Sequence, residues 1–337
     1  MTIKAMQCAA ILAAIAAAAP AARAEDQVKL AVPAQSFSFT MEYTAQDLGF
    51  FAREGVTVKE LDIAGLGAIN ALIAGSTDFA LASGASLTRA AAKGQRLLDI
   101  VALSNRPFVQ IVMRKEAAQA AGFDPAAPLK ERALALKGHT IAVDGINTVN
   151  HAYLRLIAGA GGYDPDSLKV GVMAAPSMPA AFATKAIDGF SMTPPWPQKL
   201  LVEGSAVLIA SGPGGDPANL NPMINSVLLT RDEVCAQRKE VCAKVGRAYA
   251  RAALLIRDQP DQVVAVLKKR FPAFDDQTIA AAFDVLRKIT PVPPAPTLDG
   301  IRNNETFNVM AGLLKPEEAL KSFDGLFTDE YVRGAVN

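Results

Sequence analysis

The sequence has few histidines, cysteines and aromatic residues, and no excess of charge of either sign. Its 337 residues include two histidines, three cysteines, one tryptophan and 6% aromatic residues. A formal net charge of +1 gives no electrostatic basis for binding nucleic acid, which requires a basic excess or cluster. His139 and His151 have no ligand spacing to the cysteines, so we expect neither a metal site nor a cofactor.

Catalytic motifs are also missing. The chain has no Gly-x-Ser-x-Gly nucleophile elbow and no phosphate-binding Gly-x-x-x-x-Gly-Lys loop. Adjacent acids such as Glu317-Glu318 are typical of first helical turns, where a negative charge favours the helix dipole. We therefore expect a protein that binds a ligand and is not an enzyme.

The longest apolar run stands near the start of the chain. Lys4 precedes an uncharged run from Cys8 to Ala19, and small residues follow at Ala22 and Ala24. The run is too short to span a bilayer, so this order predicts a secretory signal peptide over residues 1–24, cleaved after Ala24. No later stretch reaches the roughly 20 apolar residues of a membrane span, so we expect no membrane-spanning helix.

Two cysteines, Cys235 and Cys242, remain after that cleavage, in a compartment that permits disulfides. On one unbroken helix their Cα atoms would lie about 10 Å apart, whereas a disulfide needs roughly 4.4–6.8 Å. Pairing therefore requires a helix break near Gln237-Arg238, with a short helix before it and a longer one from Lys239. Two free buried thiols are the alternative.

Strand and helix patterns alternate from Val28 to Thr230, which indicates mostly parallel sheets covered by helices. The pattern restarts near Phe108, and from Arg231 onward it is almost entirely helical. This predicts a first lobe of residues 25–107 plus 231–337 and a second lobe of residues 108–230. We expect the helical return to pack on the first lobe, with a hinge near Arg106-Pro107 and Thr230-Arg231.

Loops rich in glycine, serine and threonine follow the predicted strands. Ligands of open α/β sheets bind at this edge, where helix N-termini present free N–H groups. Each loop taken alone is also what an ordinary capped helix or turn looks like, but together they predict a pocket. The predicted ligand contacts are Ser36, Phe37, Phe39, Gly65, Gly67, Ser83, Gly84, Asn147, Thr148, Thr193 and Trp196.

Several of these positions have a second interpretation. Phe37 and Phe39 are equally suited to the core, whereas Trp196, in a proline-flanked loop, is expected in the pocket. His151 is suited either to the cleft or to an exposed helix face, and we expect the exposed face. Arg106 is suited either to an acidic ligand or to pinning the hinge.

Three segments resemble the nitrate/sulfonate/taurine-type periplasmic substrate-binding proteins of ABC importers. They are residues 43–56, with the Gly49-Phe50-Phe51 and Glu54-Gly55-Val56 steps, residues 65–79, and residues 189–196. The resemblance implies a type II periplasmic binding protein of two lobes. It also implies a monomer that closes on a small solute and docks transiently to a membrane permease.

The resemblance further implies that an oxyanion ligand would meet a basic residue in the cleft, for which Arg106 is the obvious candidate. Because the sequence offers only this one obvious candidate, it departs from the oxyanion binders of the group, which argues against an inorganic anion and favours a small organic solute of sulfonate, carboxylate or heterocycle type. The rival functions are a ligand-sensing protein for a membrane receptor and an enzyme similar to the thiamine-pyrimidine synthases. The enzyme branch carries a cysteine-rich motif that this sequence does not have.

Overall fold

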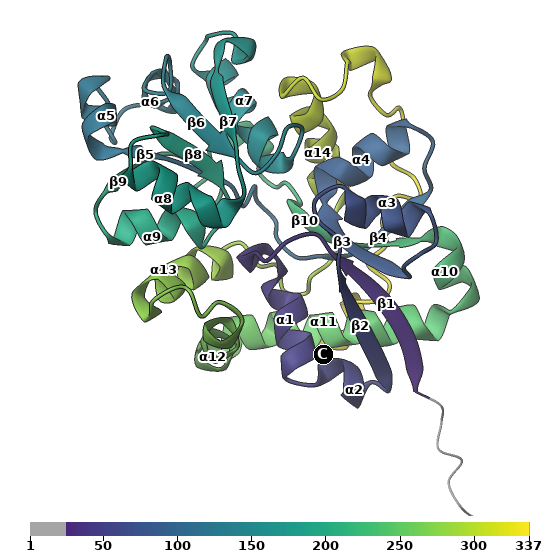
Figure 1. Ribbon diagram of the computed structural model, residues 1–337. Helices are drawn as coiled ribbons and strands as arrows, with labels where there is room; N and C mark the ends of the chain where they lie inside the picture. The colour runs from purple at the N-terminus through teal and green to yellow at the C-terminus, as the bar shows by residue number, and fades with distance from the viewer. Residues whose placement is uncertain (1–24, 337) are drawn as a thin grey trace, which may run out of the picture.

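A computed structural model describes residues 25–336, so the predicted signal peptide lies outside the described residues. The chain forms two lobes, each built on one five-stranded sheet (Figure 1). The first sheet has the order β2-β1-β3-β10-β4, and only β10 runs antiparallel to its neighbours. Its strands are β1 (Asp26–Val32), β2 (Val56–Asp62), β3 (Phe79–Ser83), β4 (Leu97–Ala102) and β10 (Ser226–Arg231).

The second sheet has the order β7-β6-β8-β5-β9 and repeats this arrangement, with β5 antiparallel to β8 and β9. Its strands are β5 (Gln110–Arg114), β6 (Thr140–Val143), β7 (Lys169–Val172), β8 (Gly189–Met192) and β9 (Ala206–Ser211). The predicted fold of two mixed, mostly parallel sheets flanked by helices is therefore confirmed.

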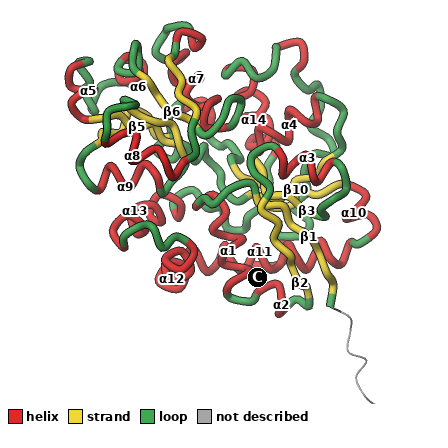
Figure 2. The backbone as a smooth tube through the Cα atoms, viewed as in Figure 1, coloured by secondary structure: helices red, strands yellow, loops and turns green. Residues whose placement is uncertain are grey.

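Helices cover the faces of both sheets, and loops gather where the lobes meet (Figure 2). The helical segment after β1 is divided at Gly49, whose φ of 70° ends the first part. The first lobe contains α1 (Thr40–Asp47), α2 (Phe50–Arg53), α3 (Gly67–Ile73) and α4 (Gly84–Ala92). The second contains α5 (Lys115–Ala120), α6 (Leu129–Leu134), α7 (Val149–Ala160), α8 (Met178–Ala183) and α9 (Trp196–Val202).

The C-terminal part is helical, as predicted. It comprises α10 (Asp232–Gln237), α11 (Lys239–Asp258), α12 (Pro260–Arg270), α13 (Asp276–Arg287) and α14 (Leu298–Met310). No helix among residues 25–336 is both long enough and apolar enough to cross a membrane. One face of α11 is apolar and is buried in the core of the first lobe through Val241, Val245, Ala248, Tyr249, Ala252 and Ile256.

One expectation about the lobes is wrong and another is incomplete. Residues 226–230 are expected in the second lobe and Thr230-Arg231 at the hinge, but β10 pairs with β3 and β4 inside the first sheet, so the second connecting segment ends before Ser226. The helical return packs on the first lobe as expected, but it also reaches the second lobe, because Phe307 and Ala311, within and just after α14, lie in the core cluster of that lobe. A strand pattern predicts an extended segment but carries no information about its pairing partner.

A buried acid–phenol pair lies in the first-lobe core. Glu42 of α1 and Tyr249 of α11 are both fully buried, and the Tyr249 hydroxyl donates a hydrogen bond to the Glu42 carboxyl. Burial raises the pKa of Glu42 from its ordinary 4.5 to about 8, although the hydrogen bond from Tyr249 opposes the shift. The carboxyl group is therefore protonated in the folded protein near neutral pH.

We expect Glu42→Gln to flatten the pH dependence of stability. The folded state holds the Glu42 proton more tightly than the unfolded state, so the free energy of unfolding falls as pH rises from about 4.5 to about 8. Glutamine cannot lose a proton, so urea unfolding should show a shallower decline between pH 5 and pH 8. Glu317→Gln, at an exposed position, is the control, and equal slopes for wild type and Glu42→Gln would contradict the prediction.

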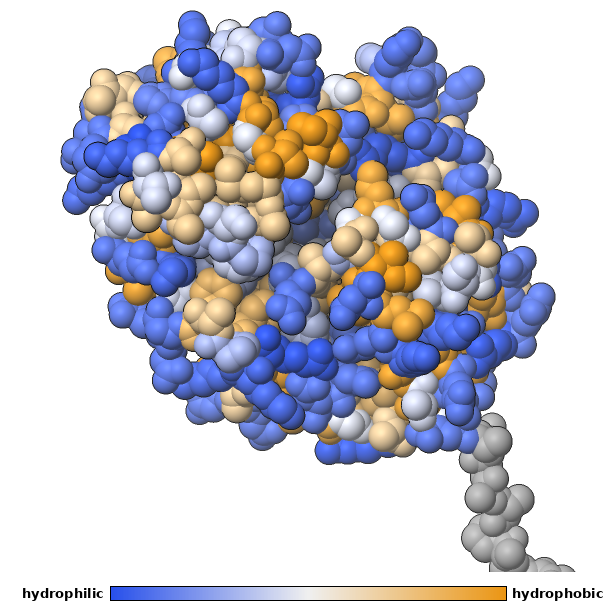
Figure 3. Space-filling model, viewed as in Figure 1, coloured by the Kyte–Doolittle hydropathy of each residue, from blue (hydrophilic) through white to orange (hydrophobic). Residues whose placement is uncertain are grey.

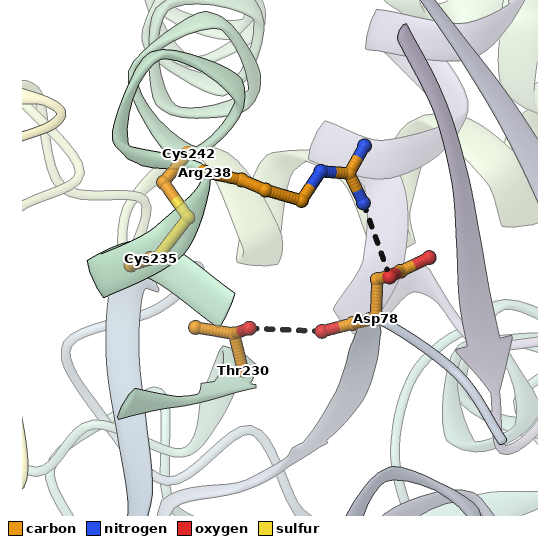
Figure 4. The surroundings of a disulfide bond; sticks show 5 residues. All are labelled: Asp78, Thr230, Cys235, Arg238 and Cys242. Carbon is orange, nitrogen blue, oxygen red and sulfur yellow. Dashed lines mark hydrogen bonds and ion pairs between the residues drawn. A yellow bond between two sulfur atoms is a disulfide. The ribbon is translucent and has the colours of Figure 1, made fainter. Parts of the chain in front are cut away.

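A disulfide joins Cys235 and Cys242, with their Cα atoms 5.7 Å apart. The predicted helix break is present, because α10 ends at Gln237 and α11 begins at Lys239. Arg238, at the break, donates a hydrogen bond to the side chain of Asp78 just before β3 (Figure 4). The turn is thus tied both to itself and to the first sheet.

Removing the disulfide with Cys235→Ala/Cys242→Ala should lower the free energy of unfolding by about 2–3 kcal/mol, because the closed loop is short. Urea unfolding measures this difference. Dithiothreitol should destabilise the wild type by a similar amount and leave the double variant unchanged. Two free thiols in the denatured, unreduced wild type would be incompatible with the bond.

Candidate functional site

The predicted loops of the two lobes meet across a cleft. Ser36, after β1, and Thr193, after β8, are both buried, and their hydroxyl oxygens lie 3.0 Å apart. The N–H of Phe37 donates to the carbonyl of Pro194 at 3.4 Å. Figure 3 shows the surface hollowed between the two lobes. Residues far apart in the sequence therefore form one polar contact at the facing edges of the sheets.

The two phenylalanines of the first loop lie in the core. Phe37 is fully buried, and its ring packs edge-on against Phe271 at 4.8 Å between centroids. Phe39 belongs to the same core cluster. Of the two interpretations, the structure agrees with the core one, and Ser36 is the polar group that this loop offers at the cleft.

Trp196, at the start of α9, is half-buried and makes a contact between the lobes. Its ring packs edge-on against Phe274, which precedes α13, with centroids 4.9 Å apart. The structure thus gives this tryptophan a packing partner in the other lobe, which the sequence did not suggest.

Close packing and backbone conformation explain the glycines of the predicted site. A Cβ on Gly84 would lie 2.3 Å from the carbonyl oxygen of Ile224, so close packing beside β10 requires glycine there. Gly65 adopts a φ of 57° in the turn before α3, and a Cβ on Gly67 would lie 3.0 Å from the Ile63 side chain. None of these glycines needs a ligand to explain it.

The loop before α7 is held by its own side chains. Thr148 caps α7 by accepting the N–H of His151, and its hydroxyl donates to Asp144 at 2.8 Å. Asn147 has a φ of 62°, and its N–H donates to Nδ1 of His151 at 3.1 Å. His151 is buried, contrary to the exposed face expected, and burial lowers its pKa. It supports the loop from beneath.

The two segments that connect the lobes run beside one another. Arg106 donates to the carbonyl of Pro213 at 3.1 Å, and the N–H of Met223 donates to the carbonyl of Asn105 at 3.0 Å. A Cβ on Gly212 would lie 2.4 Å from the carbonyl oxygen of Pro107. Of the two roles considered for Arg106, the structure shows the contact that pins these segments together.

A family model described as NMT1/THI5 like matches residues 36–263, which include the loops of both lobes and all of α11. The chain belongs to the NMT1/THI5-like family. The predicted resemblance to nitrate- and sulfonate-binding proteins is confirmed at the level of family and fold. No curated protein sequence matches the chain.

Solved structures share the fold of this NMT1/THI5-like protein. The alkanesulfonate-binding protein from Xanthomonas axonopodis pv. citri, bound to MOPS, is 18% identical with a TM-score of 0.67, covering 87% of this chain and 96% of its own. The periplasmic nitrate-binding protein from Synechocystis PCC 6803 is 17% identical with a TM-score of 0.67, covering 92% and 88%. A desulfurization enzyme is 16% identical with a TM-score of 0.62, covering 93% and 99%.

Arg89 lies in the cleft of this NMT1/THI5-like protein but is not among the ligand contacts predicted from the sequence. Its guanidinium group donates to the Ser86 hydroxyl at 3.3 Å and, across the cleft, to the carbonyl of Asn147 at 3.1 Å. Ser83, the N-cap of α4, contacts Ser86 through their hydroxyls at 2.9 Å. The spacing of Ser83, Ser86 and Arg89 by three residues was a signal, because such residues lie near one another on a helix.

Apolar side chains also lie exposed at the edges that face the cleft. Leu66 follows β2, Ile146 follows β6 and Val172 ends β7, with exposed fractions of 44%, 54% and 55%. Figure 3 shows apolar residues gathered on both sides of the hollow. The site therefore combines polar groups inside the cleft with apolar groups near its rim.

We expect the fluorescence of Trp196, the only tryptophan, to report on contact between the lobes. Phe274→Leu removes the ring against it, and such aromatic pairs are worth about 0.5–1.5 kcal/mol beyond the buried area. Without the Phe274 ring, the indole of Trp196 is more exposed to water. In solute-free protein the Trp196 emission should therefore move to longer wavelength.

The control is Phe51→Leu, which removes a ring of the same core cluster that packs on Tyr249. It should leave the emission wavelength unchanged. An unchanged spectrum for Phe274→Leu would mean that the two rings do not meet in solution.

Proposed function

We propose that this protein is the solute-binding component of an ABC importer and that it acts in the periplasm after removal of residues 1–24. It captures a small organic solute in the cleft between the lobes and delivers it to a membrane permease. The observation that carries the proposal is the facing pair of loops, where Ser36 of one lobe contacts Thr193 of the other. Family membership and the binding proteins that share the fold support it.

Closure of the lobes is the proposed mechanism. The lobes would rotate about residues 103–109 and 212–225, which connect the two sheets and hydrogen-bond to one another. A solute held by both lobes makes its full set of contacts only when the cleft is shut, so binding shifts the population toward the closed form. Helix α14, which packs on both lobes, would have to slide against one of them.

Binding explains the site better than catalysis does. The described cleft groups are hydroxyls, amides and one guanidinium, which suit hydrogen bonding to a polar head. His151 is buried beneath its loop, with Nδ1 already accepting a hydrogen bond. A desulfurization enzyme shares the fold, so a catalytic role is the second candidate function. Mass spectrometry that detects turnover of a bound solute would favour the catalytic role.

We expect a bound solute to make the protein more compact. A thermal-shift screen of sulfonates, carboxylates and heterocycles would identify the solute, and small-angle X-ray scattering would then show a smaller radius of gyration in its presence. A compound of similar size that gives no thermal shift is the control. An unchanged scattering curve with a solute that binds by calorimetry would contradict closure.

Uptake separates transport from sensing. Deleting the gene should abolish uptake of the identified solute, whereas uptake that persists would favour a sensing protein.

A further inference from the structure

Arg89 is a half-buried cation in the cleft whose only acceptors are neutral. The Ser86 hydroxyl and the Asn147 carbonyl each take one of its N–H groups. A guanidinium group has five N–H donors, so donors remain for a further acceptor. No carboxylate of the described residues lies within ion-pairing distance, and burial alone lowers the pKa of Arg89.

Most other arginines of the described chain form ion pairs with acidic side chains. Arg270 pairs with both Asp47 and Glu60, and Arg247 and Arg251 pair with Glu54. Burying a cation without a counter-charge costs free energy that a neutral carbonyl and a hydroxyl recover only in part. A position between two binding lobes is where a ligand can supply the missing charge.

The surroundings of Arg89 add to the positive potential. The N-terminus of α4, capped by Ser83, and that of α7, capped by Thr148, lie at the facing edges of the two lobes. Helix N-termini favour anions through their free N–H groups and their dipoles. Asp144, the acid of the α7 loop, already accepts hydrogen bonds from Thr148 and Asn150.

We propose that Arg89 is the counter-charge for the oxyanion head, a carboxylate or a sulfonate, of an organic solute bound between the lobes. This inference rests on the proposed solute-binding function and narrows its substrate class to anions. It also moves the basic residue of the cleft from Arg106, which pins the connecting segments, to Arg89. The exposed Leu66 and Ile146 near the rim are suited to an apolar body behind the anionic head.

The experiment compares anions with neutral compounds of the same shape. The pairs are butanoate with butanamide, benzoate with benzamide, and butanesulfonate with butanesulfonamide, with a neutral pyrimidine added. Calorimetry should show at least one anion binding about 10-fold or more tighter than its neutral partner. The carboxylate and sulfonate pairs distinguish the two kinds of head.

Arg89→Gln should weaken binding of that anion roughly 10- to 100-fold and change binding of the neutral partner little. Arg89→Lys should lose less, because it keeps the charge but not the planar fork. The solute-free Arg89→Gln protein should unfold at the same temperature as wild type or higher, since no ion pair is lost.

Two matched variants test the assignment. Arg106→Gln removes the arginine that the sequence suggested for the cleft, and Arg53→Gln removes a charge from α2, where the guanidinium lies over the Phe50 ring. Both should keep the preference for the anion. Loss of that preference in Arg106→Gln, or its survival in Arg89→Gln, would overturn the proposal.

The remaining outcomes separate this inference from the proposed function. A neutral compound that binds more tightly than every anion and makes the protein more compact would overturn the role of Arg89 and leave solute binding intact. A panel in which no compound binds would count against both.

Discussion

The position of the two antiparallel strands determines the rest of the architecture. β5 and β10 are each the first strand after the chain passes between the lobes, and each lies inside its sheet. All other strands end at the edge from which these two begin. The passages therefore lie at the carboxyl edges of both sheets, and those edges must face one another. The cleft, its hinge and the facing loops follow from this one constraint.

The distribution of charged residues in the described chain fits a binding cleft between the lobes. Away from the cleft, most arginines of the described residues form ion pairs with acids, as Arg114 does with Asp188 and Arg132 with Asp216. Inside the cleft, Arg89 meets only neutral acceptors. An ion pair there would occupy the donors that a ligand needs, so a binding site keeps its charge available at some cost in stability.

Local sequence patterns predicted where the candidate site lies better than they predicted which of its residues are available to a ligand. The predicted loops contain Ser36, Thr193 and Asn147, which make contacts across the cleft, because strand ends and helix caps leave signals within a few residues. The same patterns could not separate Phe37, which packs on Phe271, from a cleft residue. Burial depends on a partner more than 200 residues away in the chain.

The sequence by itself determined the alternation of strands and helices and the capping of α4 and α7, and it indicated where a helix break would have to lie for Cys235 to reach Cys242. These features depend on backbone preferences and on side chains close in the chain. Only the tertiary structure decided that β10 joins the first sheet, that α14 touches both lobes and that Arg89 has no acidic partner. Strand pairing and the proximity of charges arise from the packing of distant segments, which no local periodicity encodes.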